Sequence, residues 1–599
     1  MTEKTTTPPS QKIAGHLLVE CLLAQGVTHA FGVPGESYLA VLDGFHAHAD
    51  QITFIINRQE GGAAFMAEAH GKLTGRPGIC FVTRGPGATN ASIGVHTAFQ
   101  DSTPMILFVG DVVSDTRDRE AFQEMNFLSF FGPSTGGMAK RVERIDDARR
   151  IPEYVARAFA TAMNGRPGPV VLVLPEDMLA SVVTAHASGA MPQALPRVEP
   201  VEAWSDPGSL RYLREMLLNS ERPLVIAGGG GWTVKAAQAL QRFAENWKLP
   251  VGNAFRFQDT FDNFHPLYAG DVGIGINPKL AQRLKDSDLI IAIGPRLGEM
   301  TTGGYTWLAA PRPQQKLVHI HASAEELNRV YQADLAIQST MSAAARSLEV
   351  LTAPATVPWE SWSQACNADY LANMTPTAMP GLDGDTLRGV VDMPAIVASL
   401  QKHLPADAVL TNGAGNFASW MHRFFKHHGL VKGFKTQLAP TNGAMGYGVP
   451  AGIAAAITSR GVAGLASAAR VVFTIAGDGD FLMNGQELAT ATQYGAKTII
   501  VLLNNGMFGT IRMHQERDYP QHVAGTALVN PDFAALARAY GYAGVKITKT
   551  EEFEAELLAA LARPQGTLIE VALDPEVITT RGTLSAIRNN ALGKMLQGR

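Results

Sequence analysis

The sequence predicts an α/β protein made of three doubly wound domains, each with a parallel sheet, and three observations support this class. The chain has 599 residues, too many for one hydrophobic core at ~100 to 200 residues per domain. Two proline-containing stretches with few large apolar residues, 185–200 and 351–386, divide it into thirds. Within each third, continuous apolar runs alternate with alanine- and leucine-rich stretches, which is typical of parallel strands covered by helices on both faces.

We therefore predict domains over 12–185, 200–350 and 385–599. Each predicted strand is a short run that contains β-branched residues. Most of these runs end in glycine, proline or a polar residue. They lie at 53–56, 79–83, 105–110 and 170–175 in the first domain, at 223–231, 289–294 and 317–321 in the second, and at 471–477 and 498–505 in the third.

Composition restricts the partners and the compartment of the protein. The formal net charge is −4, so no basic field exists to attract nucleic acid or an anionic membrane. No apolar run is long enough to cross a bilayer. Three widely spaced cysteines, Cys21, Cys80 and Cys366, fit neither a disulfide framework nor a CxxC metal site. We expect a cytoplasmic protein with no nucleic-acid or membrane partner.

The stretch IAGDGDF, 475–481, points to a metal site. Asp478 directly follows an apolar run and lies between two glycines, Gly477 and Gly479, which permit a sharp turn and a close approach to a ligand. A helix-like stretch, NGQELATATQYG, leads to the next predicted strand, which ends in Asn504 and Asn505. Because ligands bind at the carboxyl ends of parallel strands, these oxygen donors suit Mg²⁺ with a phosphate-bearing ligand.

An alternative interpretation of both pieces is purely structural. GDG alone can be a turn, and NN alone can be a helix or turn cap. We favour the metal site because both pieces occur at the ends of consecutive predicted strands.

The spacing of GDG and NN resembles that of thiamine-diphosphate-dependent enzymes, and further segments are similar to the acetolactate (acetohydroxyacid) synthase-like branch of that family. The resemblance extends from about Lys12 through nearly the whole chain. It is carried by FGVPGES (31–37), RQEGGAAFMAEAHGKLTG (58–75), TRGPGATN (83–90), DSTPM (101–105), AFQE (121–124), RPGPVVLVLPED (166–177) and GAMGYGVPAGIAAA (443–456).

The resemblance implies pyrimidine-binding, central and diphosphate-binding domains, in that order. It implies that Asp478, the Asn505 side chain and the Met507 carbonyl bind Mg²⁺. It also implies that thiamine diphosphate is held by residues of the third domain, with Met445 as an apolar wedge and the Gly443 carbonyl as an acceptor. The diphosphate contacts would come from Gly415, Asn416, Gly477 and Gly479.

Glu60 is implied to activate the cofactor. It stands before GGAAFMA, a segment without charge. The alternative is an acid stabilised by the amino terminus of a helix that begins there. Because Glu60 belongs to the first domain and the metal site to the third, the family resemblance implies a site shared between two chains, in a homodimer or homotetramer.

Several segments depart from true acetolactate synthases. His514 stands where those enzymes have the tryptophan that selects the acceptor, and an expected lysine falls near Gly136 and Gly137. His514 could be a general acid near the acceptor, since histidine titrates near neutrality, or a plain surface histidine. Gln123, in AFQE, is a second pocket candidate.

The segments that carry flavin in those enzymes are altered as well. AGDVGIGIN (269–277), RLGEM (296–300) and HIHASAEE (319–326) replace them, so FAD is doubtful. The glycine run 228–231 and Arg296 could still hold an adenine nucleotide, or they could be tight strand-end turns with a surface arginine.

The function implied is decarboxylation of a 2-oxo acid, with carboligation of the product to a second carbonyl compound. The alternative is a non-ligating decarboxylase of a 2-oxo acid or an oxalyl-CoA-type substrate. A third is a noncatalytic cofactor-binding subunit, which the presence of Glu60, Asp478 and Asn505 argues against. Asp480 is given no ligand role; we expect its side chain to cap or orient the loop.

Overall fold

The computed structural model describes residues 12–132, 137–376, 391–432, 435–459 and 470–596. Gly136, residues 377–386 of the second expected linker and residue 385, the predicted start of the third domain, lie outside these ranges. The chain forms two compact units. The first comprises residues 1–71, 76–99 and 103–200, and the second comprises 72–75, 100–102 and 201–599.

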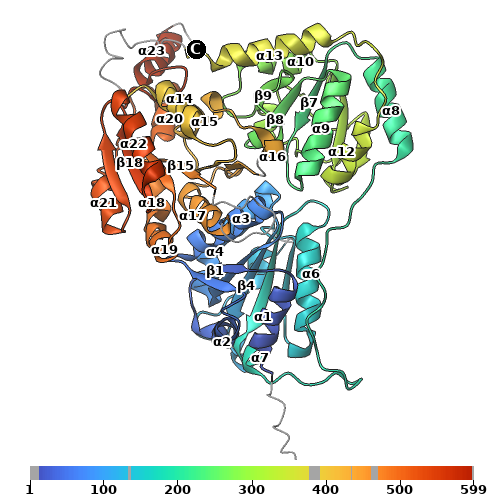
Figure 1. Cartoon of the computed structure of the whole chain (residues 1–599), viewed down its shortest axis with the longest axis vertical. Helices are drawn as coiled ribbons and strands as arrows, with labels where there is room; N and C mark the ends of the chain where they lie inside the picture. Colours follow the sequence, from blue (N-terminus) through green and yellow to red (C-terminus); the bar gives the residue numbers. More distant parts are fainter. Residues whose placement is uncertain (1–11, 133–136, 377–390, 433–434, 460–469, 597–599) are drawn as a thin grey trace, which may run out of the picture. The chain divides into compact units, whose positions relative to one another are not determined.

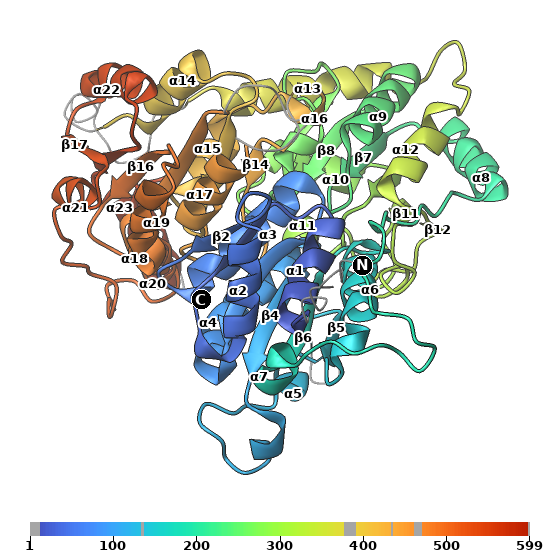
Figure 2. The ribbon, with the colours of Figure 1, turned by 60° about the horizontal axis from the view of Figure 1, so that its bottom comes forward.

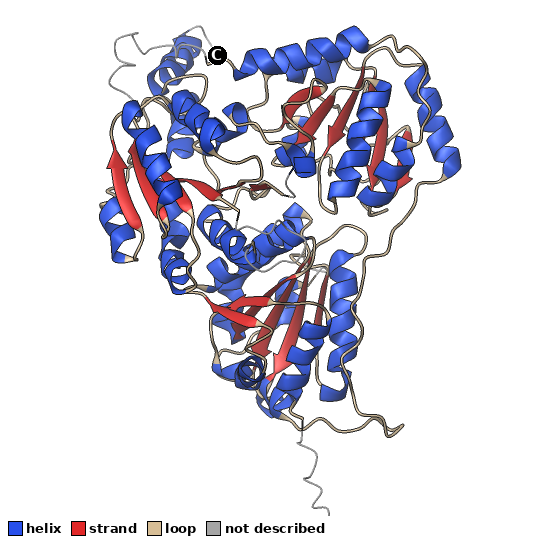
Figure 3. Cartoon of the chain, viewed as in Figure 1, coloured by secondary structure: helices blue, strands red, loops and turns tan. Residues whose placement is uncertain are grey.

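Three six-stranded sheets make up the framework, and within the described residues every strand pairing in them is parallel. Figure 3 shows each sheet with helices packed around it. This confirms the predicted fold class. The strand orders are β2 (Thr53–Ile56), β1 (His29–Gly32), β3 (Gly78–Thr83), β4 (Met105–Asp111), β6 (Pro169–Pro175), β5 (Arg141–Arg144); then β12 (Leu335–Gln338), β11 (Lys316–His321), β10 (Leu289–Ile293), β7 (Pro223–Ala227), β8 (Val251–Ala254), β9 (Tyr268–Val272); then β14 (Gln437–Leu438), β13 (Val409–Asn412), β15 (Val472–Gly477), β16 (Ile499–Asn504), β18 (Thr567–Ala572), β17 (Ala543–Ile547).

The second sheet shows why its strands read as continuous apolar runs. Along β7, Val225 and Ala227 join one core cluster, whereas Leu224 and Ile226 join another. The first cluster holds residues of α9 (Val234–Trp247) and α12 (Met341–Glu349), and the second holds Leu280 of α10 (Pro278–Asp286). Successive side chains therefore face opposite layers of helices, and both faces exclude water.

Helices cover the first sheet in the same way. One core cluster packs side chains of α1, α2 and α6 against strands β3, β4 and β6, and Figure 2 shows α1 and α2 side by side over this sheet. The helices of the first third are α1 (Ala14–Ala24), α2 (Leu39–Ala47), α3 (Glu60–Thr74), α4 (Arg84–Asp101), α5 (Phe127–Phe131), α6 (Ile151–Met163) and α7 (Glu176–Ala180).

The remaining helices belong to the middle and last thirds of the chain, and Figure 1 labels most of them. In the middle third they also include α8 (Pro207–Leu218), α11 (Glu299–Thr302) and α13 (Glu360–Met374). In the last third they are α14 (Met393–His403), α15 (Ala418–Phe424), α16 (Gly429–Lys432), α17 (Gly448–Thr458), α18 (Asp478–Asn484), α19 (Leu488–Gln493), α20 (Gly509–Asp518), α21 (Phe533–Ala539), α22 (Thr550–Ala562) and α23 (Leu584–Leu596).

The prediction that 351–386 is a linker is wrong for residues 360–374, which form α13. Cys366 and Tyr370, one helical turn apart, are buried there, and the helix packs on β9 and α10. The polar residues between them hid this period of about four. The first expected linker, 185–200, lacks helices and strands.

Among the described residues, no helix combines the length and the apolar character needed to cross a membrane. The three cysteines are buried and unpaired.

Candidate functional site

Asp478 lies at the carboxyl end of β15, next to the end of β16. The two strands pair in parallel, with Gly477 opposite Leu503, so their ends lie at one edge of the sheet. Asp478 is buried. Its Oδ1 accepts the N–H of Gly479 at 2.9 Å, and its Oδ2 accepts the N–H of Gly506 at 2.9 Å. The expected proximity of the two strand ends is therefore confirmed.

Asn530 also contacts this edge, and no motif in the sequence pointed to it. Its Nδ2 donates to Asp478 Oδ2 at 2.8 Å and to Asn504 Oδ1 at 2.9 Å. Its own Oδ1 is buried and has no hydrogen-bond partner among the described residues. The Asn530 amide therefore links the Asp478 carboxylate to Asn504 at the end of β16.

One cavity of about 250 Å³ opens at this edge and brings the predicted residues together. It lies beside the carboxyl ends of β13, β15 and β16, where open α/β sheets bind ligands. Every cofactor and metal residue predicted from the sequence lines it: Gly415, Asn416, Gly443, Met445, Gly477, Asp478, Gly479, Asn505 and Met507.

The glycines beside Asp478 are needed for a reason other than the expected sharp turn. A Cβ on Gly477 would lie 2.8 Å from the Phe417 ring, and one on Gly479 would lie 2.5 Å from the Phe508 ring. Gly479 is already in the first turn of α18. Close aromatic packing therefore excludes side chains here, whereas a left-handed backbone is found at Gly443, with φ +71° and open space around it.

Asp480 also lines the cavity, and its carboxylate binds the backbone of two loops. Its Oδ1 accepts the N–H of Ala414 at 3.2 Å and the N–H of Gly446 at 2.9 Å. The side chain thus orients two neighbouring loops. Burial raises the pKa of Asp480 to about 7, against the lowering effect of these hydrogen bonds. Burial also raises the pKa of Asp478, and its hydrogen bonds from Gly479 and Asn530 oppose that shift.

Glu60 and Gln123 lie in the first unit, where both flank the segment 84–90. Glu60 is the first residue of α3, as expected, and its Oε2 accepts the Asn90 Nδ2 at 2.9 Å. Gln123 has a left-handed backbone, with φ +63°, and its carbonyl accepts the N–H of Gly85 at 2.9 Å. Asn90 was not singled out in the sequence, although it ends the segment TRGPGATN.

His514 lies in the second unit on α20 and does not line the cavity. Thr510, one turn earlier on the same helix, does line it. The Thr510 hydroxyl accepts the N–H of Asn416 at 2.9 Å. Partial burial, and then the nearby Arg517, lower the pKa of His514.

The glycine run of the central domain is packed against the chain itself. A Cβ on Gly229 would lie 2.1 Å from the Gly294 carbonyl oxygen, and one on Gly230 would lie 2.2 Å from that of Ser102. Arg296 donates from Nη2 to the Gln100 carbonyl at 2.5 Å. Close backbone packing therefore accounts for these two glycines, but Gly229 and Arg296 also line a cavity of about 300 Å³.

The fold and the cavity define an α/β protein with a ligand site at the carboxyl ends of parallel strands. Sequence models of the thiamine pyrophosphate enzyme family match the chain over residues 13–130 (N-terminal TPP binding domain), 210–348 (central domain) and 413–571 (C-terminal TPP binding domain).

Relatives that align with nearly the whole chain agree with these matches. The "Probable acetolactate synthase large subunit" of Methanocaldococcus jannaschii is 30% identical over 567 residues, which cover 93% of this chain and 91% of the relative. The acetolactate synthase large subunit of Parasynechococcus marenigrum is 30% identical over 92% of this chain and 86% of the relative. The acetolactate synthase isozyme 2 large subunit of Escherichia coli is 29% identical over 93% of this chain and 95% of the relative. The chain belongs to the thiamine pyrophosphate enzyme family.

Proposed function

We propose that this protein binds thiamine diphosphate with Mg²⁺, decarboxylates a 2-oxo acid and joins the product to a second carbonyl compound, as an acetolactate synthase does. One observation carries the proposal: the cavity at the ends of β13, β15 and β16 is lined by every cofactor and metal residue that the family resemblance implies. The relatives, which are named acetolactate synthases, support carboligation over the non-ligating alternative.

The donor set at the cavity suits a hard divalent cation. Asp478 offers a carboxylate, Asn505 an amide oxygen and Met507 a backbone carbonyl, and all three residues line the cavity. Among the described residues, no cluster of three histidine, cysteine, aspartate or glutamate side chains could hold a metal. A single carboxylate supplemented by neutral oxygens and the diphosphate is how Mg²⁺ commonly binds.

Thiamine diphosphate, when bound, supplies the electron sink that makes loss of CO₂ and attack on a second carbonyl possible. The chain's own residues hold it and manage protons. Gly415, Asn416 and Gly479 hold the diphosphate, and Met445 and the Gly443 carbonyl orient the organic part. Glu60 would exchange a proton with the bound pyrimidine ring, and the hydrogen bond from Asn90 would fix the orientation of the Glu60 carboxyl. His514 and Gln123 are the candidates for contacting the acceptor.

We propose a homodimer or homotetramer in which Glu60 of one chain serves the cofactor bound by another. The assignment of Glu60 and Asp478 to different compact units supports this. We also propose a cytoplasmic location, supported by three buried, unpaired cysteines. The predicted bounds 12–185 and 385–599 are retained as a proposal, whereas the central domain, predicted as 200–350, is proposed to extend through α13 to Met374.

The test is reconstitution of the apo-protein with thiamine diphosphate and Mg²⁺, followed by a panel of 2-oxo acids with and without added aldehyde acceptors. With pyruvate we expect acetolactate or acetoin, identified by mass spectrometry. Acetaldehyde as the only product would instead favour a simple decarboxylase. No release of CO₂ from any member of the panel would refute both.

We further propose that the protein carries no flavin. The segments 269–277, 296–300 and 319–326, which replace the flavin-carrying segments of acetolactate synthases, support this. The absorbance spectrum of protein purified without added cofactor tests it: bands near 375 and 450 nm, roughly stoichiometric with protein, would contradict the proposal, since these are the flavin bands and the flavin would have co-purified.

A further inference from the structure

Arg256 reaches from the central domain to two loops that line the cofactor cavity. It follows β8 and is buried, with 8% of its surface exposed. Its Nη1 donates to the Gly413 carbonyl at 3.1 Å and to the Pro440 carbonyl at 2.6 Å. We call residues 413–416 and 440–446 the cofactor loops, because Gly415 and Asn416 lie in one and Gly443 and Met445 in the other.

Asp480 binds the same two loops, but through their backbone N–H groups rather than their carbonyls. It accepts the N–H of Ala414 and the N–H of Gly446. Each cofactor loop therefore gives a carbonyl to a buried arginine and an N–H to a buried aspartate. Arg256 and Asp480 also attract each other, and each favours the charged form of the other.

The backbone around the pair is shaped to bring these groups close. Arg256 has a left-handed backbone conformation, with φ +64°. This conformation is unfavourable for a residue with a side chain and persists only where the surrounding structure enforces it. A Cβ on Gly413 would lie 2.0 Å from Asp480 Oδ1, so the loop can approach the carboxylate only as glycine. Both observations are independent of the hydrogen bonds.

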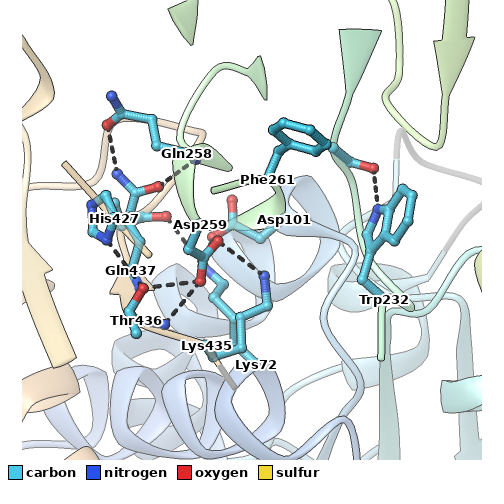
Figure 4. A network of polar contacts seen from close by, with 12 residues as sticks. Lys72, Asp101, Trp232, Gln258, Asp259, Phe261, His427, Lys435, Thr436 and Gln437 are labelled. Atoms are coloured by element: carbon cyan, nitrogen blue, oxygen red, sulfur yellow. Dashed lines mark hydrogen bonds and ion pairs between the residues drawn. The ribbon is translucent and has the colours of Figure 1, made fainter. Parts of the chain in front are cut away.

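The segment after Arg256 anchors one cofactor loop further. Figure 4 shows Gln258 and Asp259 beside Thr436 and Gln437, immediately before the 440–446 loop. Asp259 Oδ2 accepts the N–H of Thr436 at 2.9 Å and that of Gln437 at 3.1 Å. The Gln258 N–H donates to Gln437 Oε1 at 2.8 Å. The central domain is thus joined to the start of this loop by buried polar contacts.

We propose that Arg256 and Asp480 form one positioning unit that sets the geometry of both cofactor loops, so that affinity for thiamine diphosphate depends on an arginine of the central domain. This rests on the proposed cofactor site. It also assigns a role to Asp480. Neither side chain touches the reacting atoms; both act through the loops.

The first readout is the dissociation constant for thiamine diphosphate in Mg²⁺ buffer, measured by calorimetry on the full chain. We expect R256M and D480A each to raise it by about tenfold or more, since the loops lose a fixed geometry. R256K, which keeps the charge and one donor, and D480N, which keeps the acceptor Oδ1, should recover part of the affinity. Because the two residues act together, the R256M/D480A double variant should be clearly less than additive.

Arg470 supplies the matched control. It is also buried and donates to backbone carbonyls, those of Asp407 and Lys435, outside the cofactor loops. R470M should lower the melting temperature but leave the dissociation constant within about twofold, a shift below 1 kcal/mol. If R256M changes melting temperature as R470M does and leaves cofactor affinity unchanged, the proposal is overturned.

A second readout needs no cofactor. Hydrogen–deuterium exchange of the apo-protein should show faster exchange in peptides covering 409–417 and 439–447 for R256M and D480A, and not for R470M. Unchanged exchange in both peptides would overturn the proposal even if affinity fell. Failure of this proposal can be distinguished from failure of the proposed reaction. Wild-type protein that binds the cofactor but releases no CO₂ still allows both the affinity and the exchange measurements.

Discussion

At the scale of single residues, two neighbouring aspartates of the site, Asp478 and Asp480, have different hydrogen-bond partners. Asp478 is buried and shares its oxygens with N–H donors of the β16 loop and Asn530. Asp480, two residues later, uses its carboxylate on two other loops. The same residue type therefore contacts the loop after β16 at position 478 and two other loops at position 480.

We predict that D478A lowers turnover by about a hundredfold or more, because removal of the only carboxylate among the proposed ligands weakens Mg²⁺ binding. A titration of activity with Mg²⁺ at saturating thiamine diphosphate measures the effect. D518A, which changes an exposed aspartate paired with Arg517, is the control and should behave as wild type. An unchanged Mg²⁺ requirement in D478A would remove Asp478 from the metal site.

We predict that E60Q lowers kcat by about 10²- to 10⁴-fold, the usual range for loss of a positioned proton-transfer group. Stopped-flow and steady-state assays with a 2-oxo acid measure this. N90A should cost less, because it removes only the hydrogen bond that orients the carboxyl. E199Q, at a largely exposed glutamate, is the control. Wild-type turnover in E60Q would exclude the catalytic assignment.

At the scale of elements, α20 forms part of the cavity wall and is tied to α23 by one glutamate. Glu516, buried on α20, accepts hydrogen bonds from the guanidinium groups of Arg512 on the same helix and Arg588 on α23. These hydrogen bonds, the one from Arg588 foremost, lower the pKa of Glu516 to about 2. The position of Thr510 at the cavity therefore depends on a contact far along the chain.

We predict that E516Q lowers the free energy of unfolding by about 3 kcal/mol at pH 7, the equivalent of a pKa shift from 4.5 to about 2. Because the folded pKa is lowered, this stability is fully present above about pH 4.5 and is lost as the pH falls toward 2. The difference in melting temperature between wild type and E516Q should thus shrink below pH 4.5. A difference that stays constant down to pH 3 would contradict this.

At the scale of the whole molecule, the second unit contains two sheets joined by buried polar contacts. Asp259 Oδ1 lies 3.6 Å from Lys435 Nζ, and both side chains are buried. Asn263 exchanges backbone and side-chain hydrogen bonds with His427. Burial lowers the pKa of His427 to about 4, so this histidine is neutral at physiological pH.

We predict that D259A destabilises the protein by about 3 to 5 kcal/mol, because it leaves the Lys435 charge and two N–H groups buried without their partner. Calorimetry should show a lower first transition, with the two sheets of the second unit no longer unfolding together. H427F, which keeps the ring volume and loses one hydrogen bond to Thr436, should cost less. Wild-type thermal behaviour in D259A would show that the contacts do not join the two sheets.

We predict that mixing inactive E60Q chains with inactive D478A chains restores activity. If each site uses Glu60 of one chain and Asp478 of another, mixed dimers contain one intact site, and random pairing of equal amounts yields about a quarter of the wild-type activity per chain. Mixing after mild dissociation, followed by an activity assay and light scattering, measures this. Recovery should be absent when each variant is mixed only with itself. No recovery from dimers shown to be mixed would place both residues on one chain.

Most of the apolar strands were predictable because both of their faces are buried, whereas 53–56 is a partly exposed edge strand. The runs at 53–56, 79–83, 105–110, 170–175, 223–231, 289–294, 317–321, 471–477 and 498–505 all correspond to observed strands. The missed strands include β8, VGNA, and β17, AGVKI. These carry glycine, asparagine or lysine, and their strand conformation is stabilised by neighbours rather than by their own composition.

The sequence by itself determined the α/β class, the family and the lining of the cofactor cavity. Hydrophobic runs and strand-end residues are local, and a parallel sheet brings its strand ends together wherever the runs pair. Only the tertiary structure decided what Asp480, Asn530 and Arg256 contact. Their partners lie from 26 to 184 residues away, and a hydrogen bond across such a separation leaves no periodicity in the chain, because it depends on how loops from different sheets pack.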